Sequence, residues 1–115
     1  MRVLLDENVP VQLKPLLTAG RIDWLNQLGW KQLSNGRLLS AMEGAYDLQI
    51  TADRNLYAQQ NLDGRPFSVL VLPFNRRRDV LELAPLIQEL LATIQLGSYV
   101  VIDRDRTVTT RFTGS

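Results

Sequence analysis

The chain has 115 residues, of which 45% are hydrophobic and 22% are charged, and this composition predicts one globular domain over residues 1–115. It contains no Cys and no His, which excludes disulfides, thiol nucleophiles, zinc sites built on Cys or His, and Ser-His-Asp triads. Thirteen basic and twelve acidic residues give a net charge of +1, so only a local basic patch could hold a polyanion.

No apolar run is long enough to cross a bilayer, and the N-terminal run is interrupted by Asp6 too early for a secretory signal. We therefore expect a cytoplasmic protein with no membrane partner. If the protein is an enzyme, carboxylates that hold an oxygen-preferring cation, Mg²⁺ or Mn²⁺, are the chemistry that this composition allows.

The N-terminal third predicts a strand and a short helix. Residues 2–5 form an apolar run typical of a buried strand, and the run ends at Asp6. The next stretch, VQLKPLLTAG, predicts a helix of only one or two turns, because Pro15 would clash inside a longer helix and Gly20 suits a C-cap. Residues 21–33 suit a strand or a helical piece equally well, and the pattern leaves them open.

The middle of the chain predicts a helix, a strand, a second helix and a buried strand. Ser34 or Asn35 suits the N-cap of a helix that ends near Gly44, and DLQIT is the next strand. A helix is expected over residues 54–61. The run FSVLVLP then predicts a strand that is covered on both faces and lies near the centre of the sheet.

The C-terminal part predicts a long helix and a hairpin. Helical spacing of apolar residues runs from Arg76 to Gly97, and Pro85 either kinks the first turns or marks the true start. The segment SYVVIDRDRTVTTRF predicts two strands about an Asp-Arg-Asp turn. Strands that alternate with helices predict an α/β fold with a mostly parallel central sheet, flanked by helices and completed by a C-terminal β-hairpin.

Carboxylates follow two of the predicted strands. Asp6 follows the first strand and Asp53 follows the third, and ligands of parallel sheets bind outside the carboxyl ends of the strands. If these strands are neighbours, the two carboxylates form an acidic notch suited to a divalent cation. The amides of Asn8, Asn35 and Asn55 offer neutral oxygens to the same notch.

The segments LLDEN and TADRNL, with a GW...NG.LL stretch between them, resemble the small PIN-like domains related to VapC toxin ribonucleases of toxin-antitoxin systems. The resemblance covers residues 1–102. It implies a three-layer PIN-like domain that binds Mg²⁺ or Mn²⁺ at the carboxyl edge of its sheet and hydrolyses RNA. It also implies an antitoxin as protein partner, and a homodimer is a further state that the sequence leaves open.

The resemblance carries over to particular positions. It places catalytic and metal-binding carboxylates on Asp6 and Asp53, while two further metal-binding positions, often Asp in the family, fall on Asn35 and Asn55. An amide oxygen can bind a metal but brings no negative charge, so we expect a lower metal affinity. The implied reaction is metal-assisted phosphodiester hydrolysis, which requires no histidine.

Arg76, Arg77 and Arg78 form the densest basic run of the chain. They are expected at the carboxyl edge of the fourth strand, ahead of a helix N-terminus whose dipole disfavours cations. We therefore predict that they bind RNA phosphates. A solvated loop or a contact patch for a protein partner explains the same run equally well.

Structural roles compete with these functional ones. Asn35 and Asp53 stand where helix N-caps are expected, whereas Asp6 is harder to explain, because a carboxylate that ends an apolar strand is desolvated at a cost. A phospho-accepting receiver domain is disfavoured, because the only lysines, Lys14 and Lys31, do not follow the last parallel strand.

Two further alternatives are left open. The first is a catalytically reduced PIN-like domain that only binds RNA or protein, which fits the asparagines at two family acid positions. The second is a purely structural domain, which would hold if Asp6 and Asp53 were far apart.

Overall fold

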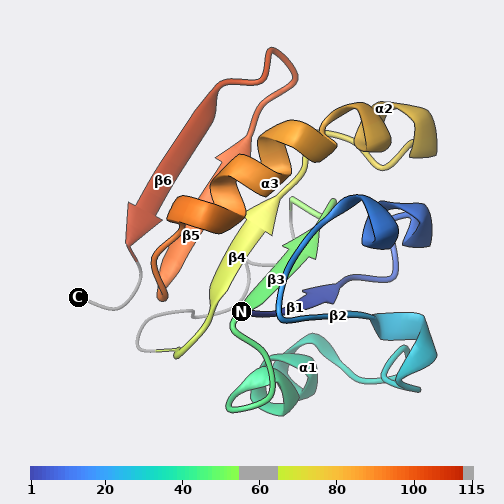
Figure 1. The fold of residues 1–115 in the computed structure, drawn as a ribbon. Coiled ribbons are helices and arrows are strands. Elements are labelled where there is room, and N and C mark those ends of the chain that lie inside the picture. The colour runs from blue at the N-terminus through green and yellow to red at the C-terminus, as the bar shows by residue number, and fades with distance from the viewer. Residues whose placement is uncertain (55–64, 113–115) are drawn as a thin grey trace.

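The computed structural model describes residues 1–54 and 65–112, which form one six-stranded sheet in the order β2-β1-β3-β4-β5-β6. The strands are β1 (Arg2–Leu5), β2 (Arg21–Trp24), β3 (Leu48–Thr51), β4 (Ser68–Val71), β5 (Ser98–Ile102) and β6 (Val108–Phe112). All neighbouring strands are parallel except β5 and β6, which form an antiparallel hairpin (Figure 1). The predicted α/β class, the mostly parallel sheet and the C-terminal hairpin are confirmed.

Helices cover both faces of the sheet. The described helices are η1 (Val11–Leu16), η2 (Leu25–Gln27), α1 (Asn35–Met42), α2 (Arg77–Glu82) and α3 (Ala84–Thr93), where η denotes a 3₁₀-helix. Figure 1 shows α3 crossing in front of β4 and β5, with α2 beside it and α1 at the other side of the sheet. The arrangement is compatible with a three-layer α/β domain.

Two hydrophobic clusters hold these layers together. Side chains alternate along a strand, so Val3 and Leu5 of β1 pack with η1, α2 and α3, whereas Leu4 packs with η2 and α1. Strands β3 and β4 lie in the middle of the sheet and are buried at every position, as the apolar run FSVLVLP predicted for β4.

The segment that the sequence left open, residues 21–33, begins as an edge strand. Arg21 to Trp24 pair with β1 in parallel, and η2 follows directly. The strand has an exposed or half-buried residue at each position, because only one of its edges is paired. The Trp24 indole Nε1 donates a hydrogen bond to the Val9 carbonyl at 3.0 Å, which ties β2 to the loop after β1.

The helical signal from Arg76 to Gly97, in which Pro85 was expected to mark either a kink or the true start, corresponds to two helices. Helix α2 ends at Glu82, and α3 starts at Ala84 with Pro85 in its first turn. Proline is tolerated there because the first N–H groups of a helix have no partner within it. Pro85 therefore marks a true start, which was one of its two interpretations. The helix expected over residues 54–61 lies almost entirely outside the described residues.

The strand order decides which carboxyl ends lie together. Strand β1 is flanked by β2 and β3, and Leu5 pairs with Ile50 at the end of β3. The Asp6 N–H continues this pairing and donates to the Ile50 carbonyl at 2.9 Å. The segments that follow β1 and β3 therefore leave the sheet side by side. No helix in residues 1–54 and 65–112 has the length and apolar character of a membrane span.

Candidate functional site

Asp6 is held rigidly at the carboxyl edge of β1. The residue is only 6% exposed, although it carries a carboxylate. Its Oδ1 accepts a hydrogen bond from the Glu7 backbone N–H at 2.9 Å, and its Oδ2 accepts one from the Thr51 hydroxyl at 2.6 Å. One donor on each oxygen fixes the orientation of the carboxylate and leaves further lone pairs for another partner.

The surroundings of Asp6 favour a cationic partner. Burial raises the pKa of the Asp6 carboxyl most strongly, and the hydrogen bonds from Thr51 and from the Glu7 backbone lower it only in part. The negative charges of Glu7 and Asp53 raise it further, so the net shift is upward. A positive charge placed beside this carboxylate would relieve both the desolvation and the repulsion.

Thr51 connects Asp6 to Asp53. The Thr51 hydroxyl, which donates to Asp6, also accepts a hydrogen bond from the Asp53 backbone N–H at 3.1 Å. Thr51 is fully buried at the end of β3, so its side chain joins the segments that leave two neighbouring strands. The sequence placed Asp6 and Asp53 at strand ends, but it did not single out the threonine between them.

Asp6 and Asp53 line the same cavity, which has a volume of about 60 Å³. Its polar lining consists of Asp6, Glu7, Asn8, Lys31 and Asp53. Its apolar lining consists of Leu25, Trp30, Leu33 and Leu38, which come from η2, α1 and the loop between them. We call this hollow the acid pocket. Since about 10–15 Å³ of water-accessible volume is enough to hold one water molecule, the acid pocket has room for a small ion with some of its water.

The charges of the acid pocket match a divalent cation. Among its described lining residues are three carboxylates and one ammonium group, which leave a net charge of −2 when all are ionised. The donors that could reach a cation are oxygen atoms of carboxylates and an amide, and hard ions such as Mg²⁺ and Mn²⁺ prefer such ligands.

The protein supplies few ligands by itself. In the part of the chain that the structure describes, no group of three or more Asp, Glu, His or Cys side chains is placed to hold a metal ion. Two carboxylates, Asp6 and Asp53, are compatible with Mg²⁺, which usually keeps several waters and takes its other ligands from substrate phosphates.

Of the three asparagines proposed as neutral ligands, only Asn8 has a side chain that the structure describes. The Asn8 Oδ1 accepts a hydrogen bond from the Ala52 backbone N–H at 3.0 Å, so this amide ties the loop after β1 to the loop after β3. Asn55 and the side chain of Asn35 lie outside the described residues. Ser34, rather than Asn35, is the N-cap of α1, because its Oγ accepts a hydrogen bond from the Arg37 N–H.

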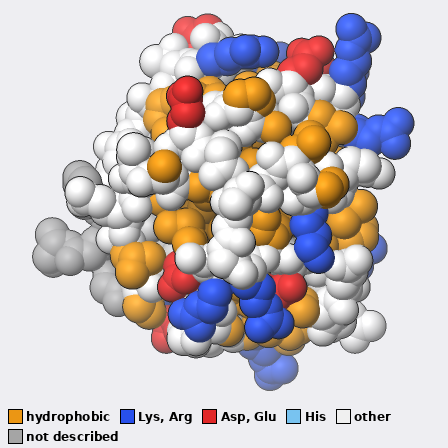
Figure 2. Space-filling model, in the orientation of Figure 1, with side chains coloured by type: hydrophobic (Ala, Val, Ile, Leu, Met, Phe, Trp, Pro, Cys, Tyr) orange, Lys and Arg blue, Asp and Glu red, His pale blue; other side chains and the backbone are white. Residues whose placement is uncertain are grey.

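The arginine run lies at the expected edge of the sheet but on the other face. Arg76 precedes α2, and Arg77 and Arg78 form its first turn, where all three are exposed. Helix α2 packs on η1 and belongs to the cluster of α3, whereas the apolar wall of the acid pocket belongs to the cluster of α1. None of the three arginines is among the described residues that line the acid pocket. Figure 2 shows basic side chains projecting from the corner where Figure 1 places α2.

Sequence reasoning did not assign Trp30 and Lys31 to the site. Both lie in the loop between η2 and α1, where the sequence pattern was ambiguous. The Trp30 ring packs edge-on against Tyr46, with ring centroids 5.8 Å apart, which holds the start of this loop against the body of the domain. An aromatic residue and a lysine in an irregular loop are a weak signal, and only folding places them beside the acids.

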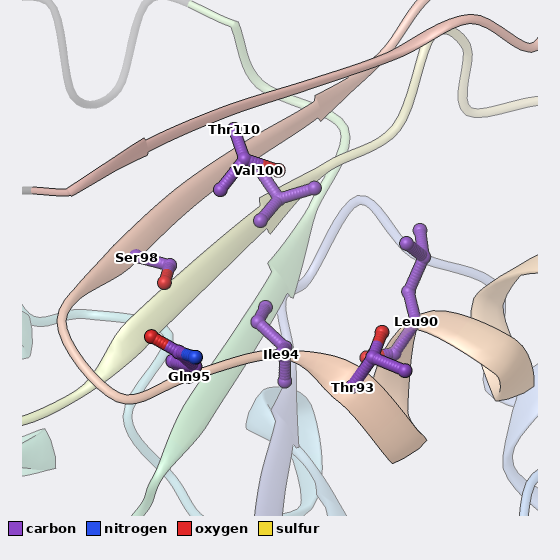
Figure 3. A pocket seen from close by; sticks show the side chains of 7 residues that line it. All are labelled: Leu90, Thr93, Ile94, Gln95, Ser98, Val100 and Thr110. Atoms are coloured by element: carbon purple, nitrogen blue, oxygen red, sulfur yellow. The ribbon is translucent and has the colours of Figure 1, made fainter.

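A second hollow lies at the opposite edge of the sheet, between the end of α3 and the hairpin (Figure 3). Its volume is about 150 Å³, and it is lined by Leu90, Thr93, Ile94, Gln95, Ser98, Val100 and Thr110. None of these described side chains is charged, so they offer no general acid, general base or charged metal ligand. The buried Ser98 hydroxyl has no hydrogen-bond partner among the described residues, and the hollow is large enough for water to reach it.

Comparison with known proteins adds no relative to these observations: no protein-family model matches the chain, and neither a curated protein nor a solved structure is significantly similar to it.

Proposed function

We propose that this protein is a PIN-like, Mg²⁺- or Mn²⁺-dependent endoribonuclease that acts as the toxin of a toxin-antitoxin pair. The observation that carries the proposal is the shared acid pocket of Asp6 and Asp53 at the carboxyl ends of neighbouring parallel strands. The net charge of −2 and the oxygen donors of this pocket fit one divalent cation. The LLDEN and TADRNL segments that resemble the PIN-like family contribute these same two acids.

The residues of the acid pocket have distinct roles in this proposal. Asp6 and Asp53 would hold the metal, and Thr51 keeps the Asp6 carboxylate oriented toward the pocket. When bound, the metal supplies a water of lowered pKa and offsets charge on the transferred phosphate. Leu25 and Leu38 form an apolar wall that limits the access of bulk water.

A catalytically reduced module that binds RNA or protein is the second candidate. It is favoured by the loss of acidic side chains at positions that are often Asp in the family. Of the four positions that the family resemblance assigns to the metal, two are asparagines, which contribute no charge. In this case the exposed arginines Arg76, Arg77 and Arg78 would contact RNA or an antitoxin.

Metal binding is tested by a Mn²⁺ titration of the wild type, Asp6→Asn, Asp53→Asn and Glu89→Gln. Glu89 is an exposed carboxylate on α3, away from the acid pocket, and serves as the matched control. We expect Mn²⁺ to raise the melting temperature of the wild type and of Glu89→Gln, and to leave both aspartate variants unchanged. An equal response of all four proteins would contradict a metal site at Asp6 and Asp53.

Cleavage is tested separately on single-stranded RNA. We expect slow, Mn²⁺-dependent hydrolysis that is abolished in Asp6→Asn and in Asp53→Asn and kept in Glu89→Gln. If Mn²⁺ binds at the acid pocket and RNA binds to the protein, but the wild type cleaves no faster than Asp53→Asn, the binding module replaces the enzyme as the function.

A further inference from the structure

The loop between η2 and α1 places one cation at the acid pocket. Lys31 is the single basic residue among the described residues that line this pocket, and it shares the lining with Asp6, Glu7 and Asp53. The side chain is exposed, so its ammonium group can lie at the mouth of the pocket. Gly29, two residues earlier, has a φ of +74°, a conformation that residues with a side chain rarely adopt, so the turn before Lys31 depends on glycine.

Lys31 takes part in no salt bridge among the described residues. The salt bridges among the described residues all use arginines, as in the pairs Arg2–Asp47 and Arg65–Glu43, whereas Lys31 lines the pocket that contains the buried Asp6. We propose that Lys31 is the phosphate-binding residue of the site and that it holds a non-bridging oxygen of the RNA phosphodiester. This inference rests on the proposed function, because it assumes that Asp6 and Asp53 hold a divalent cation.

The charges of the acid pocket explain why such a residue is needed. A divalent cation brings the net charge of the described lining from −2 to zero, and this balance already counts the ammonium of Lys31. Without Lys31 the loaded pocket would be negative and would repel the anionic phosphodiester. An ammonium group has three donors on a flexible stem, so it can follow the phosphate as negative charge develops on its oxygens.

This role gives Lys31 two effects of opposite sign. Its charge repels a divalent cation in the same pocket, and it attracts a phosphate. Lys31→Met should therefore bind Mn²⁺ more tightly and RNA more weakly than the wild type. A variant that is merely misfolded would lose both affinities, so the opposite changes separate a direct charge effect from structural damage.

The experiment measures both affinities for the wild type, Lys31→Met, Lys31→Arg and Lys14→Met. Lys14, on η1, is the only other lysine of the chain, and its charge acts on Asp23 rather than on the acid pocket. Calorimetry measures Mn²⁺ binding without RNA. Fluorescence anisotropy measures binding of a short single-stranded RNA within seconds of mixing, at saturating Mn²⁺ for each variant.

For Lys31→Met we expect Mn²⁺ affinity to rise about three- to tenfold, as for the loss of one charge several ångströms from the ion at a partly solvated site. We expect its RNA affinity to fall at least threefold, because one phosphate contact is lost. Lys31→Arg and Lys14→Met should both bind Mn²⁺ and RNA with the affinities of the wild type.

The outcomes distinguish this inference from the proposed function. If Mn²⁺ binds in an Asp6-dependent manner but Lys31→Met matches the wild type in both affinities, Lys31 is a solvated surface residue and only the present inference is wrong. If the wild type shows no Mn²⁺ binding that Asp6→Asn removes, the metal site and the role of Lys31 are both overturned.

Discussion

The Thr51 hydroxyl donates a 2.6 Å hydrogen bond to the buried Asp6 carboxylate, and so connects the ends of two neighbouring parallel strands. Replacing Thr51 with Val keeps the shape of the side chain but leaves the Asp6 Oδ2 without this donor. We expect the free energy of unfolding at pH 7 to fall by about 2 kcal/mol, as for a hydrogen bond to a charged group. Urea denaturation measures the change.

Thr51→Ser is the control for this prediction, because it keeps the hydroxyl and removes only a buried methyl group. Its destabilisation should be smaller, about 1 kcal/mol. Equal losses in the Val and Ser variants would mean that the hydroxyl of Thr51 does not stabilise Asp6.

The Tyr46 hydroxyl donates a 2.5 Å hydrogen bond to the Asp23 Oδ2. Burial raises the pKa of the Asp23 carboxyl, but the hydrogen bonds from Tyr46 and Arg21 outweigh this effect, so the net pKa is lowered. Burial, followed by the bond to Asp23, raises the pKa of Tyr46 to about 12. We therefore expect Tyr46→Phe to lose about 2 kcal/mol of stability at neutral pH.

The stability lost in Tyr46→Phe should depend on pH, and it should decrease both in acid and in strong base. A lowered Asp pKa contributes stability above its unfolded value of about 4, which disappears as the pH falls through the folded pKa. A raised Tyr pKa contributes stability below its unfolded value of about 10, which disappears as the pH rises through 12. The difference in free energy of unfolding between the wild type and Tyr46→Phe, measured by urea denaturation, should be constant from about pH 5 to 9. It should become smaller below and above that range. A gap that does not narrow in acid would rule out the link to Asp23.

Gln49 lies fully buried on β3 with no hydrogen-bond partner for either amide atom among the described residues. It pairs with Leu4 and Val69 on the neighbouring strands, which are apolar. Gln49→Met keeps the length of the side chain and removes the desolvated amide, so we expect stability to rise by about 1 to 3 kcal/mol. A less stable Met variant in urea denaturation would show that the amide is hydrogen-bonded in solution.

Arg76, Arg77 and Arg78 are predicted to bind RNA phosphates outside the acid pocket. Replacing all three with Ala should weaken RNA binding and reduce the slope of log affinity against log salt by about 2, since each contact to a single strand contributes about 0.7. Without added divalent metal, the change should be the same in the Asp6→Asn background, because a carboxylate does not attract phosphate in the absence of a cation. Fluorescence anisotropy over a range of salt concentrations measures the slope.

The control removes three exposed arginines of the hairpin region, Arg104, Arg106 and Arg111, and so lowers the net charge equally. If both triple variants bind RNA alike, the run at α2 has no specific role in RNA binding. If the Arg76–78 variant binds as the wild type does, these arginines are better assigned to a protein partner such as an antitoxin.

Local patterns in the sequence were sufficient to predict most elements of the sheet. The runs RVLL, LQIT and SVLV are strands because each is short and apolar, and such runs are stable only when they are covered on both faces. Strand β2 was left open between a strand and a helical piece, because an edge strand is only half covered and its sequence, RIDW, does not need an apolar pattern. The break between α2 and α3 was visible in Pro85 only as one of two alternatives.

The sequence by itself determined the chemistry of the candidate site: without Cys or His, carboxylates at strand ends are the groups that could bind a metal, and Asp6 and Asp53 follow two such strands. The tertiary structure alone decided what surrounds them. It placed β3 beside β1, so that Thr51 reaches Asp6, brought Lys31 from an irregular loop to the acid pocket, and placed the arginine run over the opposite face. Strand order and loop packing depend on contacts between residues far apart in the chain, and the local periodicity of the sequence does not predict those contacts.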